Sequence, residues 1–297
     1  MKTNKALVST LIVILIAGLL VFGISGENKD KLLRVGTKMY FPTAVDFAGE
    51  TTPLQITDVK ERLDRELLIN ANLDATTALI IKRANRAFPV IEPILAKYGV
   101  PDDFKYLAVI ESGLVNASSP AGAKGVWQFM PDTAKEKGME VNDLVDERYH
   151  LEKSTEAACK YLLAAKSKFG SWTLAAASYN GGMTGVGKKI EEQKVVDYYD
   201  LALTEETSRY VFRILALKEI MKNPATYGFN IYPTDLYASI PFKKIEVDSS
   251  ITDLADFAKT QGINYKILKL HNPWLRDKKL LNPTKKKYEI EIPLSGY

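Results

Sequence analysis

Cysteine and histidine are scarce in this sequence, with one cysteine and two histidines among 297 residues. A single cysteine cannot form an intramolecular disulfide, and it excludes a cysteine-rich metal site. His150 and His271 lie far apart along the chain without metal-ligand spacing around them, so we expect no histidine-metal site. Cys159 falls on a helical stripe rich in Ala and Leu and is expected to be a small core residue. The sequence therefore predicts neither a metal nor a cofactor.

A phosphate-binding loop is also missing. Gly181, Gly182, Gly185 and Gly187 are spaced somewhat like the glycines of such a loop. They follow a predicted helix rather than a strand, and no Walker Lys-Ser/Thr pair accompanies them. Nucleotide binding is therefore not predicted.

The N-terminus carries an export signal. Lys2 and Lys5 precede an apolar run from Ala6 to Ile24, so residues 1–26 are predicted to be a signal peptide or signal anchor. The run is near the lower limit for crossing a bilayer, and cleavage and retention as a membrane anchor both stay open. No cysteine follows it, which argues against a lipoprotein. We expect an exported protein of the periplasm or cell envelope.

The small positive charge is concentrated at the C-terminal end. The chain has a formal net charge of +4, and from Ala238 onward eleven Lys and Arg residues stand against seven Asp and Glu residues. Lys285, Lys286 and Lys287 are expected to form a solvated turn. A basic region on an exported protein suits an anionic cell wall or membrane surface. Because no nucleic-acid recognition motif is present, nucleic acid is not a predicted partner.

Glu111 closes a predicted short helix that begins at Pro101 and ends at Gly113. One face of this helix combines the carboxyl group with apolar residues at i, i+3, i+4 and i+7 spacing, namely Phe104, Leu107, Ala108 and Glu111. Burial and the negative end of the helix dipole both disfavour an ionised carboxylate and raise its pKa. Such a group can serve as a general acid near neutral pH. The helix alone is equally consistent with a buried ion pair to Lys or Arg.

The segments after this helix combine turns with apolar walls. A turn is predicted over residues 119–125, and Gln128 follows within the apolar run Val126–Met130. A buried amide needs hydrogen-bond partners, and one presented by a hydrophobic wall suits sugar hydroxyl and acetamido groups. An Ala-rich helix is predicted from Trp172 to Tyr179, ending at residues 180–182.

Most glycosidases use two carboxyl groups, and the candidates for a second one in this sequence lie in polar surroundings. Asp132 follows Pro131 at a predicted helix start, where an acidic cap or dipole partner is common. Asp146, Glu147 and Arg148 form a polar stretch that is expected to be a solvated loop. No second carboxyl group lies in apolar surroundings, which favours single-acid chemistry unless folding brings a distant partner close.

Four segments together carry a resemblance to a known family: Glu111-Ser112, residues 119–131 with Trp127-Gln128-Phe129-Met130, residues 177–182, and residues 206–211. They resemble the catalytic domain of the soluble lytic transglycosylases and are closest to the membrane-bound lytic transglycosylase D type. The resemblance covers roughly residues 85–225, about half of the chain. Its departure at Val126-Trp127, where the wider family has Leu-Met, concerns subsite geometry rather than chemistry.

The resemblance implies a mainly α, lysozyme-like catalytic domain that cleaves peptidoglycan between N-acetylmuramic acid and N-acetylglucosamine. Glu111 would protonate the leaving oxygen and then deprotonate the muramyl 6-hydroxyl, with help from the acetamido group, to give a 1,6-anhydro product. A muramidase that hydrolyses the same bond stays open, as does a non-catalytic wall-binding protein.

The resemblance also implies residues that contact the glycan. Ser119 and Gln128 would lie near the scissile bond, while Tyr179 and Asn180 would stand opposite the acid across the cleft. Tyr210 would line the cleft wall, although its helix spacing is equally consistent with core packing.

A change of pattern after Ala238 predicts a separate C-terminal module. Alternating strands over residues 243–247 and 288–292 flank two helices over residues 251–258 and 265–270. This βααβ order, with a partial Leu-Asn-Pro motif at residues 270–273, is similar to a degenerate LysM module, which implies glycan binding. A packing or partner-binding role stays open.

These patterns predict four regions: residues 1–26 as the export segment, residues 27–84 as an irregular and helical arm, residues 85–235 as the catalytic domain, and residues 238–297 as the LysM-like module. The arm contains a helix from Ile56 onward. A helical pair over residues 76–98 should bend at Pro89 and Pro93, and a long helix should run from Thr204 to Lys222.

Overall fold

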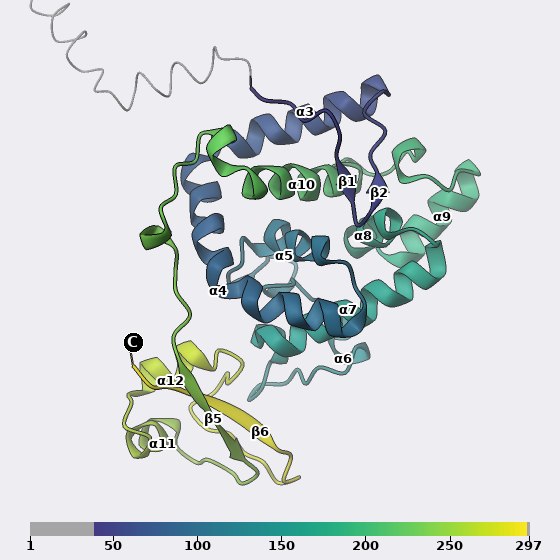
Figure 1. Ribbon diagram of the computed structural model, residues 1–297. Coiled ribbons are helices and arrows are strands. Elements are labelled where there is room, and N and C mark those ends of the chain that lie inside the picture. Colours follow the sequence, from purple (N-terminus) through teal and green to yellow (C-terminus); the bar gives the residue numbers. More distant parts are fainter. Residues whose placement is uncertain (1–38, 296–297) are drawn as a thin grey trace, which may run out of the picture. The chain divides into compact units, whose positions relative to one another are not determined.

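Apolar residues at helical spacing fold into a layered set of helices in the computed structural model, which describes residues 39–295 (Figure 1). The expected export segment, residues 1–26, lies outside the described residues, as does the first part of the expected arm. Residues 42–297 form one unit. Within residues 39–295, no helix has both the length and the apolar character needed to cross a bilayer.

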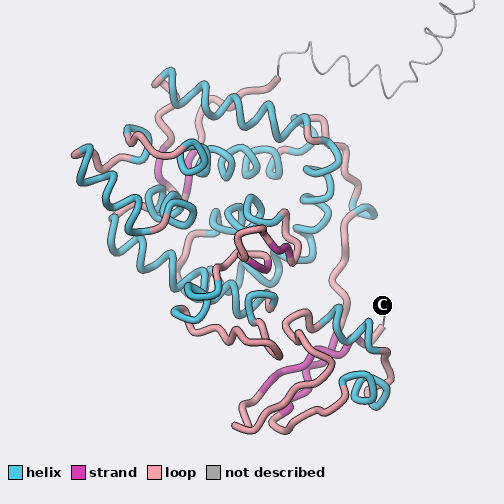
Figure 2. Tube along the Cα trace, turned by 180° about the vertical axis from the view of Figure 1, so that it is seen from behind, coloured by secondary structure: helices cyan, strands magenta, loops and turns pink. Residues whose placement is uncertain are grey.

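The helical part of this unit is built from eight α-helices, which are α3 (Thr57–Asn72), α4 (Asp74–Tyr98), α5 (Lys105–Ser112), α6 (Pro131–Glu136), α7 (Leu151–Phe169), α8 (Trp172–Gly181), α9 (Met183–Gln193) and α10 (Glu205–Lys222). It contains two very short antiparallel hairpins, β1 (Asp46–Phe47) with β2 (Glu50–Thr51), and β3 (Ala117–Ser118) with β4 (Lys124–Gly125). The view from behind shows how little of the chain is strand (Figure 2). The fold is therefore mainly α, as the sequence predicts.

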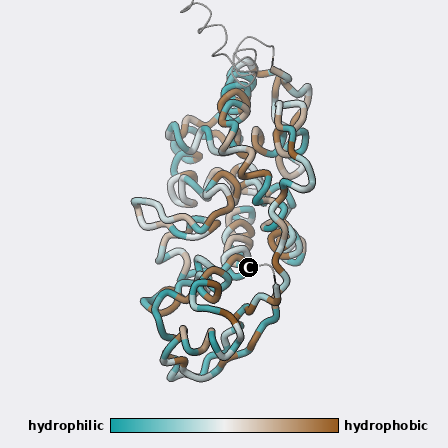
Figure 3. Tube along the Cα trace, turned by 90° about the vertical axis from the view of Figure 1, so that its left-hand side faces the viewer, coloured by the Kyte–Doolittle hydropathy of each residue, from teal (hydrophilic) through white to brown (hydrophobic). Residues whose placement is uncertain are grey.

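Helix α10 lies between α3 and α5 in Figure 1 and also packs against α8. Ten of its residues are buried, and they include Tyr210, Ile214 and Leu217, which share one face of the helix. A helix buried on most of its circumference acts as a core element rather than a surface cover. The surrounding helices alternate hydrophobic and hydrophilic residues, as expected where one face is buried (Figure 3).

The expected helical pair over residues 76–98 is a single helix, α4, which runs through both Pro89 and Pro93. A proline inside a helix removes a backbone hydrogen bond and costs about 3 kcal/mol. The buried face of α4 offsets this cost with the side chains of Ile80, Ile91 and Leu95, among others. Gly99 ends the helix in the left-handed conformation, with φ of 69°.

Helix α9 was not predicted, because residues 180–182 were expected only to end the preceding helix. Gly182 ends α8 and is also the N-cap of α9, with φ of 73°. One glycine thus turns the chain between two consecutive helices, where a side chain would strain the backbone.

The hairpin β1–β2 anchors the start of α8. The Glu50 carboxylate accepts hydrogen bonds from the backbone N–H groups of Trp172 (2.6 Å) and Thr173 (2.8 Å). It also accepts from the hydroxyl groups of Ser171 (2.8 Å) and Thr173 (2.6 Å). These hydrogen bonds hold the pKa of Glu50 below its usual value, against the opposing effect of burial. A segment far away in the sequence thereby caps the positive end of α8.

The C-terminal module has the predicted βααβ order. Strand β5 (Phe242–Val247) pairs antiparallel with β6 (Tyr288–Pro293), and the helices α11 (Leu254–Thr260) and α12 (Tyr265–His271) lie between them in the chain. Its core is not independent of the helical part, because Val145 and Tyr149 belong to the same cluster of buried residues.

Backbone and side-chain contacts join this module to residues 140–152. The Asp146 N–H donates to the Trp274 carbonyl (2.9 Å), and the Arg276 N–H donates to the Leu144 carbonyl (2.8 Å). Lys286 forms ion pairs with Glu140 (2.6 Å) and Glu147 (3.2 Å). Lys285, Lys286 and Lys287 are all exposed, as expected, and Lys286 also helps to attach the module.

The polar stretch Asp146–Arg148 is buried, so the prediction of a solvated loop is wrong. Each of its three residues is 3% exposed. Arg148 pairs with the Asp146 carboxylate through Nε (2.9 Å) and Nη2 (2.7 Å). Its Nη1 donates to the carbonyls of Gly122 (3.0 Å) and Phe129 (3.1 Å). The charges are tolerated because each is paired and hydrogen-bonded.

We expect Glu50→Ala to lower the free energy of unfolding by about 1–2 kcal/mol, because α8 loses its capping carboxylate. Urea unfolding at pH 7 measures this change. Since the pKa of Glu50 is lowered by folding, its contribution is present at neutral pH and is lost as the pH falls through the folded-state pKa. Glu61→Ala, at an exposed position of α3, is the control. Equal stability of the two variants would contradict the capping role.

Candidate functional site

Glu111 lies in the last turn of α5, and Gly113 ends this helix with φ of 61°. The predicted apolar face is confirmed, since Phe104, Leu107 and Ala108 are fully buried. The first predicted turn, residues 102–104, is a 3-10 helix rather than an α-helix. The short helix thus places one carboxyl group at the edge of the core.

Tyr210 of α10 donates a hydrogen bond from its phenolic oxygen to Oε1 of Glu111. Burial raises the pKa of Glu111 to about 7, although the Tyr210 hydrogen bond and the nearby Arg213 favour the ionised form. The negative charge of Glu206 raises the pKa further. Near neutral pH the group can therefore exist in both protonation states, as a proton donor and acceptor requires.

Tyr210 has both of the roles that were expected as alternatives, packing in the core and lining the site. Its side chain is buried with the other core residues of α10, and its hydroxyl group contacts the Glu111 carboxyl group. Burial and the charge of Glu111 raise the pKa of Tyr210 well above its ordinary value, so it stays a hydrogen-bond donor.

Tyr179 lies near the end of α8 and joins the site to the apolar wall. Its hydroxyl group donates to the Trp127 carbonyl (2.8 Å). Its ring packs edge-on against Phe129 (5.8 Å between centroids) and Tyr161 (5.1 Å). Burial raises the Tyr179 pKa well above its usual value, and the charge of Glu111 adds to this effect. Tyr179 and Glu111 are therefore close enough to interact electrostatically.

Gln128 is held by the β3–β4 hairpin. Its Nε2 donates to the carbonyls of Gly125 (2.7 Å) and Ala117 (3.2 Å). Its backbone is left-handed, with φ of 49°, which is uncommon for a residue other than glycine. With both amide hydrogens directed at the hairpin, the side-chain oxygen is the part of Gln128 available to a ligand.

Ser119 lies in the turn of the same hairpin. Its hydroxyl group accepts a hydrogen bond from the Ala123 N–H (3.0 Å), and its carbonyl accepts from the Gly122 N–H (3.0 Å). Among residues 39–295, no hydrogen bond joins Ser119 to Glu111. The structure therefore places Ser119 with the hairpin that holds Gln128 rather than on the carboxyl group.

Asn180 connects α8 with the start of α10. It donates to the Glu206 carboxylate (3.1 Å) and accepts from the Thr207 hydroxyl group (2.8 Å). Glu206 and Thr207 were not selected from the sequence as site residues, although they stand in the segment 206–211 that carries the family resemblance. In the part of the chain that the structure describes, no three His, Cys, Asp or Glu side chains are grouped to hold a metal ion.

Arg213 was also missed. It follows Tyr210 by three residues on α10, and helical residues three apart share a face. Its Nη2 donates to the Ile110 carbonyl (3.1 Å) at the end of α5, and its charge lowers the pKa of Glu111. The i+3 spacing is a signal that could have identified it.

Both the helical part and the C-terminal module match known protein families. Residues 89–201 match the family model of the transglycosylase SLT domain, and residues 243–296 match that of the soluble lytic transglycosylase C-terminal LysM-like domain. The chain is 32% identical over 182 residues to membrane-bound lytic murein transglycosylase D of Escherichia coli K12, covering 59% of this chain and 40% of that protein. The protein of the same name in E. coli O6:H1 gives the same values. The chain therefore spans less than half the length of these curated relatives.

We expect the free energy of unfolding to fall as the pH rises, because Glu111 loses its proton. In the unfolded chain a glutamate titrates near 4.5, whereas in the fold the pKa of Glu111 is about 7, so the folded state retains its proton longer. Stability is therefore lost between these two values, by about 3 kcal/mol in all. We expect Glu111→Gln to be more stable than the parent protein at pH 8 by up to about this amount, and to differ little at pH 4.5.

Urea unfolding of both proteins across this pH range measures the difference. The exposed Glu61→Gln variant should show no such dependence. A Glu111→Gln stability difference that is constant with pH would contradict the raised pKa.

Proposed function

Because the chain belongs to the SLT-domain family of lytic transglycosylases, we propose that it cleaves the β-1,4 bond between N-acetylmuramic acid and N-acetylglucosamine without water. The single observation that carries this proposal is the partly buried Glu111, whose pKa is raised to about 7 and whose carboxyl group contacts Tyr210. Peptidoglycan is the proposed substrate and binding partner, and the cell envelope the proposed place of action.

Glu111 performs both proton transfers in this proposal. In its neutral form it protonates the glycosidic oxygen, so the C1–O bond breaks and N-acetylglucosamine leaves. The muramyl acetamido oxygen bonds to C1 and stabilises the developing cation. The Glu111 carboxylate then removes the proton of the muramyl 6-hydroxyl group, and O6 forms the 1,6-anhydro bond as the acetamido oxygen leaves. The carboxyl group recovers its proton, and no water is consumed.

Burial of Glu111 and the side chains of α10 favour different protonation states of its carboxyl group, and the proposed reaction needs both states. Loss of water contact favours the neutral acid that starts the reaction. The Tyr210 hydrogen bond and the Arg213 charge favour the carboxylate that exists between the two transfers. A pKa near 7 is the compromise that lets one group serve as both acid and base.

The remaining predicted residues support substrate positioning. The Gln128 carbonyl oxygen can accept from a sugar hydroxyl or acetamido N–H group, because its amide nitrogen is already engaged. Tyr179 orients the Trp127–Phe129 wall, and Asn180 orients Glu206. Ser119 acts indirectly, because its hydroxyl group accepts a hydrogen bond from Ala123 in the turn of the hairpin that holds Gln128.

Hydrolysis of the same bond is the second candidate, and Glu206 is the observation that favours it. A hydrolase of the common kind needs two carboxyl groups. Glu206 is exposed, and its charge reaches Glu111. In a hydrolytic mechanism it could activate water, whereas in the proposed mechanism it only adjusts the Glu111 pKa and holds Asn180.

Mass spectrometry of muropeptides distinguishes the two reactions. We expect purified peptidoglycan incubated with the parent protein to release 1,6-anhydro ends. Glu111→Gln should lower the rate at least about 10³-fold, because the general acid is lost. Glu206→Gln should retain activity and still give anhydro ends. Reducing ends that disappear in Glu206→Gln would establish hydrolysis instead, and no product from the parent protein would leave a wall-binding protein.

Tyr210→Phe tests the tuning of Glu111 through the pH dependence of the rate. The free enzyme must carry a proton on Glu111, so kcat/KM should fall as the pH rises above about 7. Removing the Tyr210 donor disfavours the carboxylate, so the midpoint of this fall should move up by about one pH unit. The rate at the optimum should also fall.

The control for Tyr210→Phe is Tyr232→Phe, an exposed tyrosine whose replacement should leave the profile unchanged. A midpoint that stays at its parental value in Tyr210→Phe would show that Glu111 is not the titrating group.

A further inference from the structure

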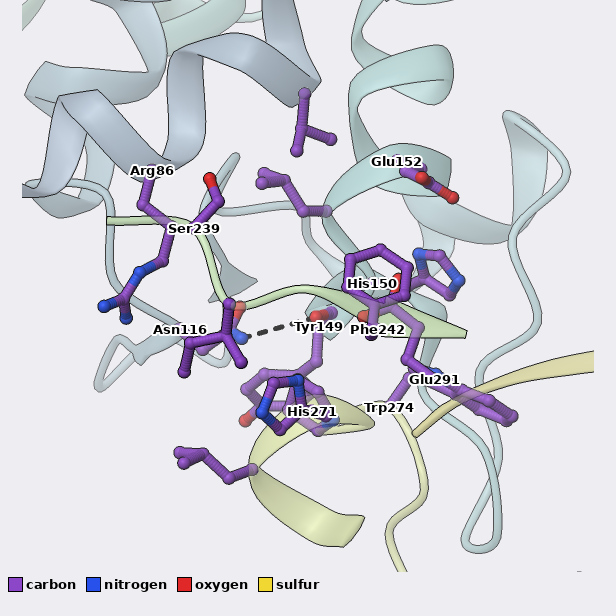
Figure 4. Close-up of a pocket in the computed structure, with 15 residues that line it drawn as sticks. Arg86, Asn116, Tyr149, His150, Glu152, Ser239, Phe242, His271, Trp274 and Glu291 are labelled. Atoms are coloured by element: carbon purple, nitrogen blue, oxygen red, sulfur yellow. Dashed lines mark hydrogen bonds between the residues drawn. The ribbon is translucent and has the colours of Figure 1, made fainter. Parts of the chain in front are cut away.

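The chain just before α7 lies between the β3–β4 hairpin and the C-terminal module and contacts both. On the hairpin side, Asn116 donates to the Tyr149 carbonyl (3.3 Å, Figure 4). On the module side, the Asp146 N–H donates to the Trp274 carbonyl (2.9 Å), and the Trp274 ring stacks on His150 (6.0 Å between centroids). This part of the chain is therefore fixed from two sides and can support the hairpin.

Arg148 is the side chain of this support that reaches the hairpin. It is 3% exposed, and its Nε and Nη2 pair with the Asp146 carboxylate. The other nearby cation, Lys124, lies further off, with its Nζ 4.0 Å from Asp146 Oδ2. Arg148 Nη1 donates to the carbonyl of Gly122 in the hairpin turn (3.0 Å) and to that of Phe129 (3.1 Å). Asp146 thus neutralises the guanidinium, and the remaining donor is directed at the hairpin.

Gln128 lies between the carbonyl groups that are held in this way. Its left-handed backbone, with φ of 49°, costs energy in a residue other than glycine and persists only where the surroundings hold it. Before Gln128, the Gly125 carbonyl accepts from its backbone N–H (3.4 Å) and from its Nε2 (2.7 Å). After it, the Phe129 carbonyl accepts from the Lys124 N–H (3.1 Å) and from Arg148 Nη1. Arg148 is therefore one of two donors that fix the backbone on the far side of Gln128.

We propose that Arg148 is a positioning residue for glycan binding, which holds Gln128 in the conformation that leaves its side-chain oxygen free for the glycan. Arg148 acts through the hairpin turn and the Phe129 carbonyl, because its own side chain is buried beneath them. This inference rests on the proposed function, in which Gln128 contacts the glycan. A substitution of Arg148 should then weaken binding only through Gln128.

A double-mutant cycle tests this dependence. The full chain carrying Glu111→Gln, which should leave the glycan uncut, is titrated calorimetrically with soluble peptidoglycan glycan strands freed of peptide. We expect Gln128→Ala to weaken binding about 10-fold, since one hydrogen bond is lost. Arg148→Lys keeps a charge beside Asp146 but loses the donor to the two carbonyls, and should weaken binding about 5- to 10-fold. The two changes together should bind within about twofold of Gln128→Ala alone.

Lys218→Gln is the control for a general loss of stability. Lys218 is also a buried cation, and its Nζ pairs with Asp103 (2.6 Å), at a site that makes no contact with the hairpin. This variant should lower the thermal unfolding temperature and leave the affinity unchanged. Thermal unfolding also verifies that each variant is folded.

Asp146→Asn repeats the test if Arg148→Lys does not fold. The amide oxygen can still accept from the Arg148 N–H and Nε, whereas the charge and the Nη2 hydrogen bond are lost. We expect about threefold weaker binding, and no further loss where Gln128→Ala is already present.

The inference is overturned if the effects of Arg148→Lys and Gln128→Ala multiply in the double variant, because Arg148 would then act independently of Gln128. Unchanged affinity in Arg148→Lys, or no binding of the strands by the Glu111→Gln protein, would also overturn it. Failure of the proposed function has a different signature, namely a parent protein that releases no 1,6-anhydro ends while the binding cycle gives the expected pattern.

Discussion

A carboxyl group keeps its proton near pH 7 only where the fold removes it from water without supplying a full counter-charge. This constraint on Glu111 explains the arrangement around it. Helix α5 is short and apolar, so its last turn reaches the core, and α10 is buried along most of its length. From α10 come a neutral donor, Tyr210, and a cation, Arg213, that lowers the pKa without forming a direct ion pair with the carboxyl group. A closer guanidinium would ionise the acid permanently.

The β3–β4 hairpin, which holds Gln128, depends on a buried charged group, Arg148. Its guanidinium is neutralised by Asp146 and donates to carbonyls of the β3–β4 hairpin and of Phe129. The approach is so close that a Cβ atom on Gly125 would lie 1.8 Å from the Arg148 carbonyl oxygen, and Gly125 has φ of 82°. Only glycine fits there. Removing one member of such a buried pair leaves an uncompensated charge, so this segment fixes the hairpin geometry.

Local periodicity was enough to predict most helices and the βααβ module, because apolar spacing reflects which face is buried. It also identified Glu111, whose helix and burial are encoded within thirteen neighbouring residues. It failed for Asp146–Arg148, since the burial of that stretch depends on the module more than a hundred residues later. Glu206 escaped for a related reason, because its importance comes from how α10 lies against α8, and a single sequence does not show such contacts. Arg213 shares a face with Tyr210 at i+3 spacing, but only the packing of α10 against α5 shows that its charge acts on Glu111.

The shared core changes what the C-terminal module can contribute. A module on a flexible linker raises the local concentration of its ligand but leaves the ligand's direction free. Here Val145 and Tyr149 are part of the module's own core, and backbone hydrogen bonds continue from Trp274 into Asp146. Asp146 in turn holds Arg148, which holds the hairpin of Gln128. The module is therefore held in one fixed orientation relative to the helical part, and a change in its packing would be transmitted to the hairpin that holds Gln128.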